Sequence, residues 1–240
     1  MRLSEDQMQH YRDEGYTVVR GLITAAEAGG VRDRLMGLME GDHDWPDLHF
    51  QVLDPSKFRN KQGGFVPVGV QRPAGQEAVF KDVADHPNLQ SAMSQLLGGP
   101  VKRLTDQALI KRPGISGESF YHQDSYYWRV DPQRGCNAWI ALDEVGAGAS
   151  ALAIMPGTHR DWTLVEHEQY FDEPNYYNAH TGEAFQRWRI PTVDFSGEAL
   201  LPMSVGDAAF FTNYTWHRAE PNTTEGYKAA YAIAYWLGER

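Results

Sequence analysis

The sequence is poor in cysteine, in long apolar runs and in clustered positive charge. Cys136 is the only cysteine among 240 residues, which excludes an intrachain disulfide and an all-cysteine metal site. No eighteen apolar residues run together, so no membrane-spanning helix is predicted. The formal net charge of -10 opposes binding to nucleic acid, because phosphates attract clustered lysine and arginine. Neither a membrane nor a nucleic acid is therefore an expected partner.

The remaining composition is that of an ordinary globular protein. Hydrophobic residues make up 42% of the chain and charged residues 22%, which suffices for a sizeable core. Residues 1–6 carry no apolar segment of the secretory type, and with the lone cysteine this predicts a cytoplasmic protein. We expect one domain over residues 1–240, since all-β units of this length are common. No signal for an oligomeric state is found.

Residues 1–100 are predicted to form a helical N-terminal part with loops. Ser4 and Gln7 have capping-box spacing, and Thr24 is a suitable cap for a second helix. The predicted elements are, in chain order, a helix at 4–14, a strand at 16–20, a helix after Thr24, a loop with short strands at 41–76 and a helix at 77–97.

From residue 101 the apolar period changes to two, which indicates strands. The predicted strands are 101–111, 119–124, 137–143, 151–155, 204–211 and 227–236. An aromatic-rich insertion at 159–195 interrupts them and is too long for a bare connector, which is typical of functional loops. The fold class is thus mainly β with flanking helices, a sandwich or jelly roll.

Two histidines and one aspartate form the pattern that points most directly to chemistry. On a strand, His122 and Asp124 would project to the same face because side chains alternate. His217 follows a glycine-aspartate turn and an apolar run, as expected for a third ligand on a neighbouring strand. Two imidazoles and a carboxylate leave three positions open on an octahedral ion, as in non-heme Fe(II) oxygenases. The alternative is a hydrogen-bonded surface pair at 122 and 124.

The last predicted strand has one face of small side chains. Lys228, Ala230, Ala232, Ala234 and Trp236 share that face, and the opposite face is mostly aromatic. The small face is expected to line a cavity, in which a lysine would pair with a ligand carboxylate. The alternative is a lysine that reaches out to water along its apolar stem.

At this point the chain resembles the phytanoyl-CoA dioxygenase family of Fe(II)- and 2-oxoglutarate-dependent oxygenases. The resemblance lies in residues 3–7, 13–22, 111–114 (Lys-Arg-Pro-Gly), 121–124 (Tyr-His-Gln-Asp), 139–143, 155–160, 206–207 and 217 with 221–222. It implies a double-stranded β-helix, the jelly roll shared with cupins. It also implies Fe(II) at His122, Asp124 and His217, with 2-oxoglutarate and O₂ as cosubstrates.

One position departs from the family pattern. The resemblance implies that the residue eleven beyond the distal histidine holds the far carboxylate of 2-oxoglutarate, and this residue is usually arginine. Here it is Lys228, a compact point charge in place of a two-pronged fork. Other groups of 2-oxoglutarate oxygenases use lysine for this task, so 2-oxoglutarate remains the expected cosubstrate.

The expected reaction is hydroxylation of a small biosynthetic metabolite, with release of succinate and CO₂. Gln107 is placed to hydrogen-bond the cosubstrate, although a half-buried structural glutamine is an equal alternative. The candidate substrate residues, each of which could instead be simple core, are Tyr126, Trp128, Arg129, Trp139 and Trp216. Two other functions stay open: a divalent-metal enzyme with non-oxidative chemistry, and an inactive binding module.

Overall fold

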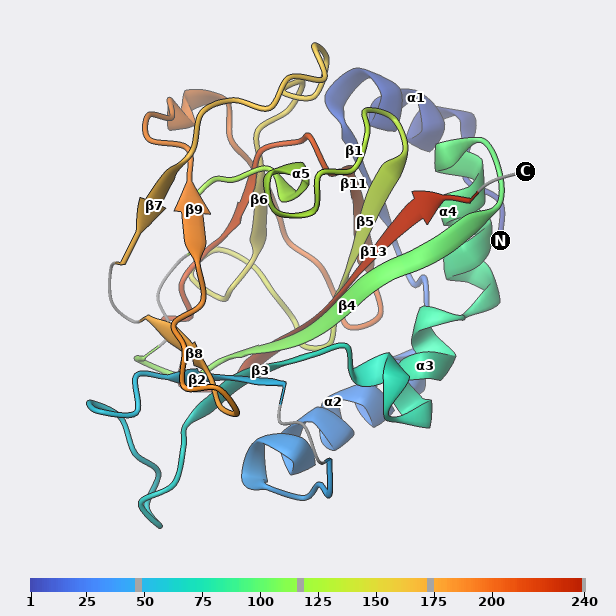
Figure 1. Cartoon of the computed structure of the whole chain (residues 1–240). Helices are drawn as coiled ribbons and strands as arrows, with labels where there is room; N and C mark the ends of the chain where they lie inside the picture. The colour runs from blue at the N-terminus through green and yellow to red at the C-terminus, as the bar shows by residue number, and fades with distance from the viewer. Residues whose placement is uncertain (46–48, 116–118, 172–174, 239–240) are drawn as a thin grey trace.

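The computed structural model describes residues 1–45, 49–115, 119–171 and 175–238, and its largest element is an antiparallel sheet of eight strands (Figure 1). The strand order in this sheet is β1-β11-β5-β13-β4-β3-β2-β8, with smaller sheets β10-β6-β12 and β7-β9. The strands are β1 Tyr16–Val19, β2 Phe50–Leu53, β3 Pro67–Gln71, β4 Val101–Lys111, β5 Gly135–Ala141, β6 Leu152–Ile154, β7 Glu168–Tyr170, β8 Tyr176–Asn178, β9 Arg187–Arg189, β10 Ala199–Leu201, β11 Ala208–Thr212, β12 His217–Ala219 and β13 Lys228–Leu237. The predicted jelly roll is confirmed.

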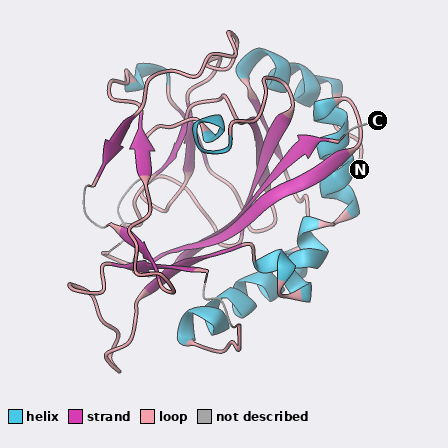
Figure 2. Ribbon diagram, in the orientation of Figure 1, coloured by secondary structure: helices cyan, strands magenta, loops and turns pink. Residues whose placement is uncertain are grey.

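Helices cover the outer face of the large sheet (Figure 2). They are α1 Glu5–Glu14, α2 Ala25–Glu40, α3 Ala78–Ala84 and α4 Pro87–Leu97, with the short helix α5 Asp124–Trp128 at the rim and 3-10 turns η1 Pro73–Gly75 and η2 Phe195–Gly197. The capping box predicted at Ser4 and Gln7 forms at α1, and the predicted cap Thr24 forms a second capping box with Glu27 at α2. Within the described residues, none of these helices is long and apolar enough to span a membrane.

Strand β13 separates the core from the interior of the jelly roll. Tyr231 and Ile233 are buried among the helices in the main hydrophobic core. Ala232 and Ala234 face the other way and line a cavity inside the jelly roll. The small side chains therefore leave space on the inner face while the large ones anchor the helices, as the alternation predicts.

Several predicted boundaries are corrected. The single helix expected at 77–97 is two helices, because Pro87 begins α4 and His86 accepts from Asn88 N as its cap. The strand expected at 119–124 is wrong: in that stretch His122 makes an isolated bridge, and Asp124 begins α5. The insertion at 159–195 holds β7, β8 and β9, and its residues 172–174 lie outside the described residues.

Gly15, at the end of α1, packs against the segment that precedes the candidate metal ligand His217. It ends α1 with φ 82°, and an added Cβ would lie 2.5 Å from both His159 Nδ1 and Thr215 Oγ1. Thr215 Oγ1 donates to Gly15 O at 2.9 Å, and Thr215 O lies 3.1 Å from Nδ1 of His217. The glycine thus permits a close approach that fixes the residues preceding His217.

Gly15→Ala is expected to lower the free energy of unfolding by about 2–4 kcal/mol, because left-handed strain adds to overpacking. Chemical denaturation measures the change. Gly21→Ala is the matched control, since Gly21 also has positive φ (58°) but no atom within 4 Å of the added Cβ. Equal costs in the two variants would show that the close approach to Thr215 contributes nothing.

Candidate metal centre and cavity

Two histidines far apart in the sequence are paired across strands. His122 N donates to His217 O at 3.1 Å and His217 N donates to His122 O at 3.2 Å, so the two residues form a hydrogen-bonded antiparallel pair. Their side chains therefore project to the same side, with ring centroids 4.3 Å apart.

Each ring is oriented by a backbone carbonyl. Nδ1 of His122 lies 2.8 Å from Phe120 O, and Nδ1 of His217 lies 3.1 Å from Thr215 O. A carbonyl only accepts, so Nδ1 carries a proton, and in the neutral ring Nε2 then keeps its lone pair. Both Nε2 atoms then face the same carboxylate.

That carboxylate belongs to Asp124, the first residue of α5. Its Oδ1 lies 3.6 Å from Nε2 of His122, and its Oδ2 lies 3.5 Å from Nε2 of His217. Asn137 on β5 donates its side-chain amide to Asp124 Oδ2 and fixes the carboxylate. Among the described residues this is the one group of three such side chains whose ligand atoms lie within 4.8 Å of one another. Two ligand atoms that each lie about 2.1 Å from a shared ion, at right angles to one another, are about 3 Å apart. The distances of 3.6 Å and 3.5 Å from Asp124 to the two histidines are close to this value.

The protonation states suit a metal. Burial lowers the pKa of His217 to about 4, although Asp124 opposes the shift, so the imidazole is neutral at pH 7. Burial would raise the pKa of Asp124, but His217 and His122 outweigh it and the carboxyl pKa lies below its ordinary value. Neutral imidazoles and an ionised carboxylate are the forms that bind a cation.

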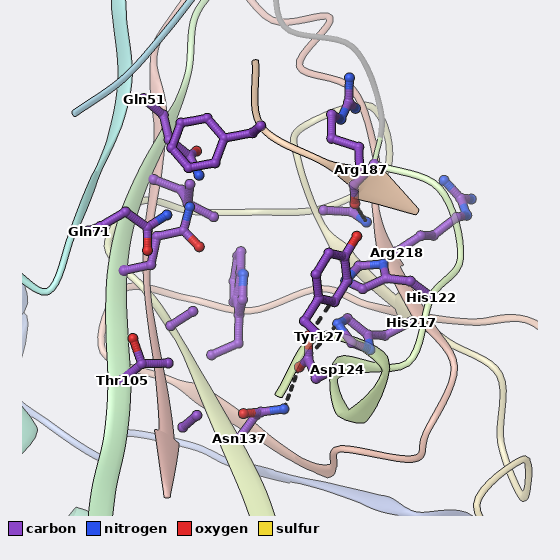
Figure 3. Close-up of a pocket in the computed structure, with 18 of the residues that line it drawn as sticks. Gln51, Gln71, Thr105, His122, Asp124, Tyr127, Asn137, Arg187, His217 and Arg218 are labelled. Atoms are coloured by element: carbon purple, nitrogen blue, oxygen red, sulfur yellow. Dashed lines mark hydrogen bonds and ion pairs between the residues drawn. The ribbon is translucent and has the colours of Figure 1, made fainter. Parts of the chain in front are cut away.

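The three side chains stand on the wall of a cavity of about 450 Å³ (Figure 3). Strands β4, β5 and β13 supply one wall, and β12 with β9 supplies the other. In Figure 3, Gln51, Gln71 and Thr105 lie across the space from His122, Asp124 and His217. A volume of this size accommodates a small molecule beside a metal.

The predicted pocket residues divide into two groups. Gln107, Trp128 and Trp139 line the cavity, whereas Tyr126, Arg129 and Trp216 are not among its lining residues. In a helix each residue turns about 100°, so from Asp124 the residues at i+3 and i+4, Tyr127 and Trp128, point with the ligand into the cavity.

The residues outside the cavity have other contacts. Tyr126 stacks on His167 with centroids 4.1 Å apart, and Arg129 lies over the Tyr126 ring at 4.8 Å. Trp216 precedes His217 in extended chain and points the opposite way, against Tyr121 and Met155. Expecting a strand at 119–124 concealed this division. Tyr127, which the sequence also offered as a pocket residue, lines the cavity, and its ring meets His122 edge-on at 5.8 Å.

The cations that line the cavity do not include Lys228. Lys228 Nζ donates to Glu144 O at 2.7 Å, and Lys228 is not among the lining residues. Lys111, directly opposite it on β4, does line the cavity, and its Nζ donates to Ala219 O and Glu220 O. Arg187 and Arg218 also line it. Sequence reasoning missed Lys111 because it did not predict the register of β4 against β13, which places Lys111 beside Lys228.

A jelly roll whose interior holds two histidines and one carboxylate defines the class of facial-triad oxygenases. The family model described as Phytanoyl-CoA dioxygenase (PhyH) matches residues 11–230, and the chain belongs to this family. It is therefore an oxidoreductase, a 2-oxoglutarate-dependent oxygenase that uses iron, 2-oxoglutarate and O₂.

Individual relatives agree with this assignment. The chain is 28% identical to a phytanoyl-CoA dioxygenase domain-containing protein 1 of Danio rerio, over 96% of this chain and 89% of the relative. It is 26% identical to a probable phytanoyl-CoA dioxygenase of Caenorhabditis elegans, over 97% of this chain and 75% of the relative. A similar fold occurs in the epimerase SnoN, crystallised with Fe³⁺, alpha ketoglutarate and nogalamycin RO: the TM-score is 0.70 at 21% identity, over 97% of this chain and 83% of SnoN.

Proposed function

We propose that this protein is a cytoplasmic enzyme that hydroxylates a small-molecule metabolite of a biosynthetic route. In the balanced reaction, one oxygen atom of O₂ enters the product and the other enters succinate as 2-oxoglutarate loses CO₂. The observation that carries the proposal is the convergence of His122, Asp124 and His217 on a cavity large enough for cosubstrate and substrate.

His122, Asp124 and His217 would hold the iron, since two neutral imidazoles and one carboxylate are a ligand set that ferrous iron accepts. When bound, iron would supply the redox chemistry that activates O₂. The protein positions the reactants: Asn137 fixes the carboxylate, and the carbonyls of Phe120 and Thr215 fix the rings.

The direct test is anaerobic addition of Fe(II) and then 2-oxoglutarate, followed by visible spectroscopy. A charge-transfer band that needs both components is the expected result, because the cosubstrate would chelate the metal. Metal binding with no band at saturating 2-oxoglutarate would contradict the proposal and favour non-oxidative chemistry.

Lys228 is proposed to bind the far carboxylate of 2-oxoglutarate. It lies on the same face of β13 as Ala232 and Ala234, and opposite Lys111 on β4. Like charges directly opposite on a sheet are unfavourable, so an anion at this end of the cavity would stabilise both ammonium groups.

Lys228→Ala is expected to weaken 2-oxoglutarate binding about 10-fold, the loss of one partly desolvated charge contact, with Fe(II) binding unchanged. Titration of the charge-transfer band measures both quantities. Lys111→Ala is the informative comparison. A loss confined to the Lys111 variant would assign the carboxylate to Lys111 and refute the role proposed for Lys228.

A further inference from the structure

Three glutamines form a polar surface on the cavity wall. Gln51, Gln71 and Gln107 stand on the neighbouring strands β2, β3 and β4, and all three line the cavity. Gln71 lies directly opposite Gln107, and Gln51 lies opposite Gly69, two residues from Gln71 on the same face. We call these three residues the glutamine face.

Gly69 keeps this surface open. An added Cβ at this position would lie 2.9 Å from Leu109 Cδ2 and 3.5 Å from Gln51 Oε1. A side chain there would intrude between the glutamines of adjacent rows. Because Gly69 has no side chain, the Gln51 amide can lie beside Gln71.

The amides of the glutamine face make no side-chain hydrogen bond within the part of the chain that the structure describes, although Gln51 is only 8% exposed. The buried Gln123 behaves differently: it donates to Thr163 O and Tyr214 O and accepts from Val165 N. Buried amides normally find such partners. The three amides instead face the cavity, where their donors and acceptors are open to a bound molecule.

Aromatic side chains also line the cavity, and Tyr176 stands on β8, the strand next to β2. Tyr170, Tyr176 and Phe185 line the cavity, and the Arg187 guanidinium lies 4.4 Å and 4.8 Å from the centroids of the two tyrosine rings. The site thus joins an aromatic wall to a wall of amides. A ring with apolar C–H faces and a polar edge suits this mixed lining.

The chemistry of the amide selects the polar edge. Each glutamine offers two N–H donors and a carbonyl acceptor. A carboxylate would use only the donors and an ammonium only the acceptors, whereas neighbouring hydroxyl groups use both. An acyl chain would leave all three amides desolvated and unpaired.

We propose that the glutamine face recognises an uncharged, hydroxyl-rich ring, with the chemistry of a glycosyl or cyclitol group, as the part of the substrate presented to the metal centre. The claim that this ring is the part of the substrate that reacts rests on the proposed function. The binding itself requires neither iron nor 2-oxoglutarate.

The test is saturation-transfer NMR on the metal-free protein with methyl α-D-glucopyranoside, myo-inositol, uracil and hexanoate as probes. The glucoside or the inositol is expected to receive saturation and to shift the side-chain amide signals of the glutamine face. Saturation of uracil or hexanoate alone would overturn the proposal, as would saturation of none.

Gln71→Leu and Gln51→Leu keep the approximate size but remove the hydrogen bonds, and each is expected to weaken polyol binding at least 10-fold. The unliganded variants should unfold at the same temperature as the parent or higher, because the amides have no partner to lose. Gln76→Leu, at an exposed position outside the cavity, is the matched control and should bind normally. A lower unfolding temperature for both variants would show that the amides are structural and would overturn the inference.

Failure of this inference and failure of the proposed function are distinguishable. If the Gln71 and Gln51 variants and the parent all give the ferrous 2-oxoglutarate band while no polyol binds, only the substrate class is wrong. If polyols bind the glutamine face and no band forms, the oxygenase function fails and the recognition surface stands.

Discussion

Asp124→Ala is expected to abolish stoichiometric Fe(II) binding and, with it, all 2-oxoglutarate turnover. The carboxylate is the only anion among the three clustered ligands, so its removal leaves two neutral imidazoles to hold a dication. Loss of partners outside the ligand set typically weakens metal binding about 10–100-fold, and loss of a ligand should exceed this range. Equilibrium dialysis under anaerobic conditions measures the iron content directly.

Asp131→Ala is the matched control, because Asp131 is an exposed aspartate shortly after α5. It should bind iron as the parent does. Near-ultraviolet circular dichroism checks that Asp124→Ala keeps the native packing. One iron per chain retained by a folded Asp124→Ala variant would refute the ligand assignment.

The fold was predictable where local signals agree with the tertiary environment. Strand β4 matches its predicted range, 101–111, because its alternation and the Gly-Gly-Pro before it point the same way. The α5 region was not predictable in this way. Five residues of helix carry too little periodicity to distinguish them from a strand, and the tertiary contacts of Asp124 and Tyr127 decide the conformation.

The candidate site shows the same limit. His122, Asp124 and His217 could be selected from residue type and sequence context, since few side-chain sets suit a facial metal site. Asn137 and Lys111 could not, because their roles depend on strand register. Lys228 was selected from its face of β13, but a face alone does not say where a long flexible side chain ends.

A buried ion network connects the segments that carry the two histidines. Glu198 accepts hydrogen bonds from Nε and Nη2 of Arg218 at 2.6 Å and 2.7 Å. It also accepts one from Tyr121 Oη at 2.7 Å. Arg218 follows His217 and Tyr121 precedes His122, so one carboxylate joins the neighbours of both ligands. The Arg218 side chain is 10% exposed, and the carboxylate of Glu220 also lies near it, at 3.6 Å.

Glu198→Ala is therefore expected to lower the free energy of unfolding by about 2–3 kcal/mol, because the charge-assisted hydrogen bonds from Arg218 and Tyr121 are lost. Iron affinity should fall as well, because the strand pairing of the two histidines loses its support. Glu198→Gln should cost less, since it keeps the size and one accepting oxygen. Denaturation and dialysis on the same samples give both quantities.

Glu168→Ala provides the matched control. Glu168 pairs with Arg189 at 2.8 Å, but its side chain is 48% exposed, and such pairs contribute about 0–1 kcal/mol. Similar losses for Glu198→Ala and Glu168→Ala would show that burial of the network contributes nothing.

The pH dependence adds an independent check. Arg218 lowers the pKa of Glu198 below its ordinary value, and this effect outweighs the opposing effect of burial. A carboxylate with a depressed folded-state pKa stabilises the protein above its unfolded pKa of about 4.3 and loses that contribution as the pH falls through the folded value. The stability difference between the parent and Glu198→Ala should hence be constant from about pH 8 to pH 5 and shrink below about pH 4. A difference that persisted undiminished in acid would mean that Glu198 acts through packing, and the ionic link between the two histidine segments would have to be abandoned.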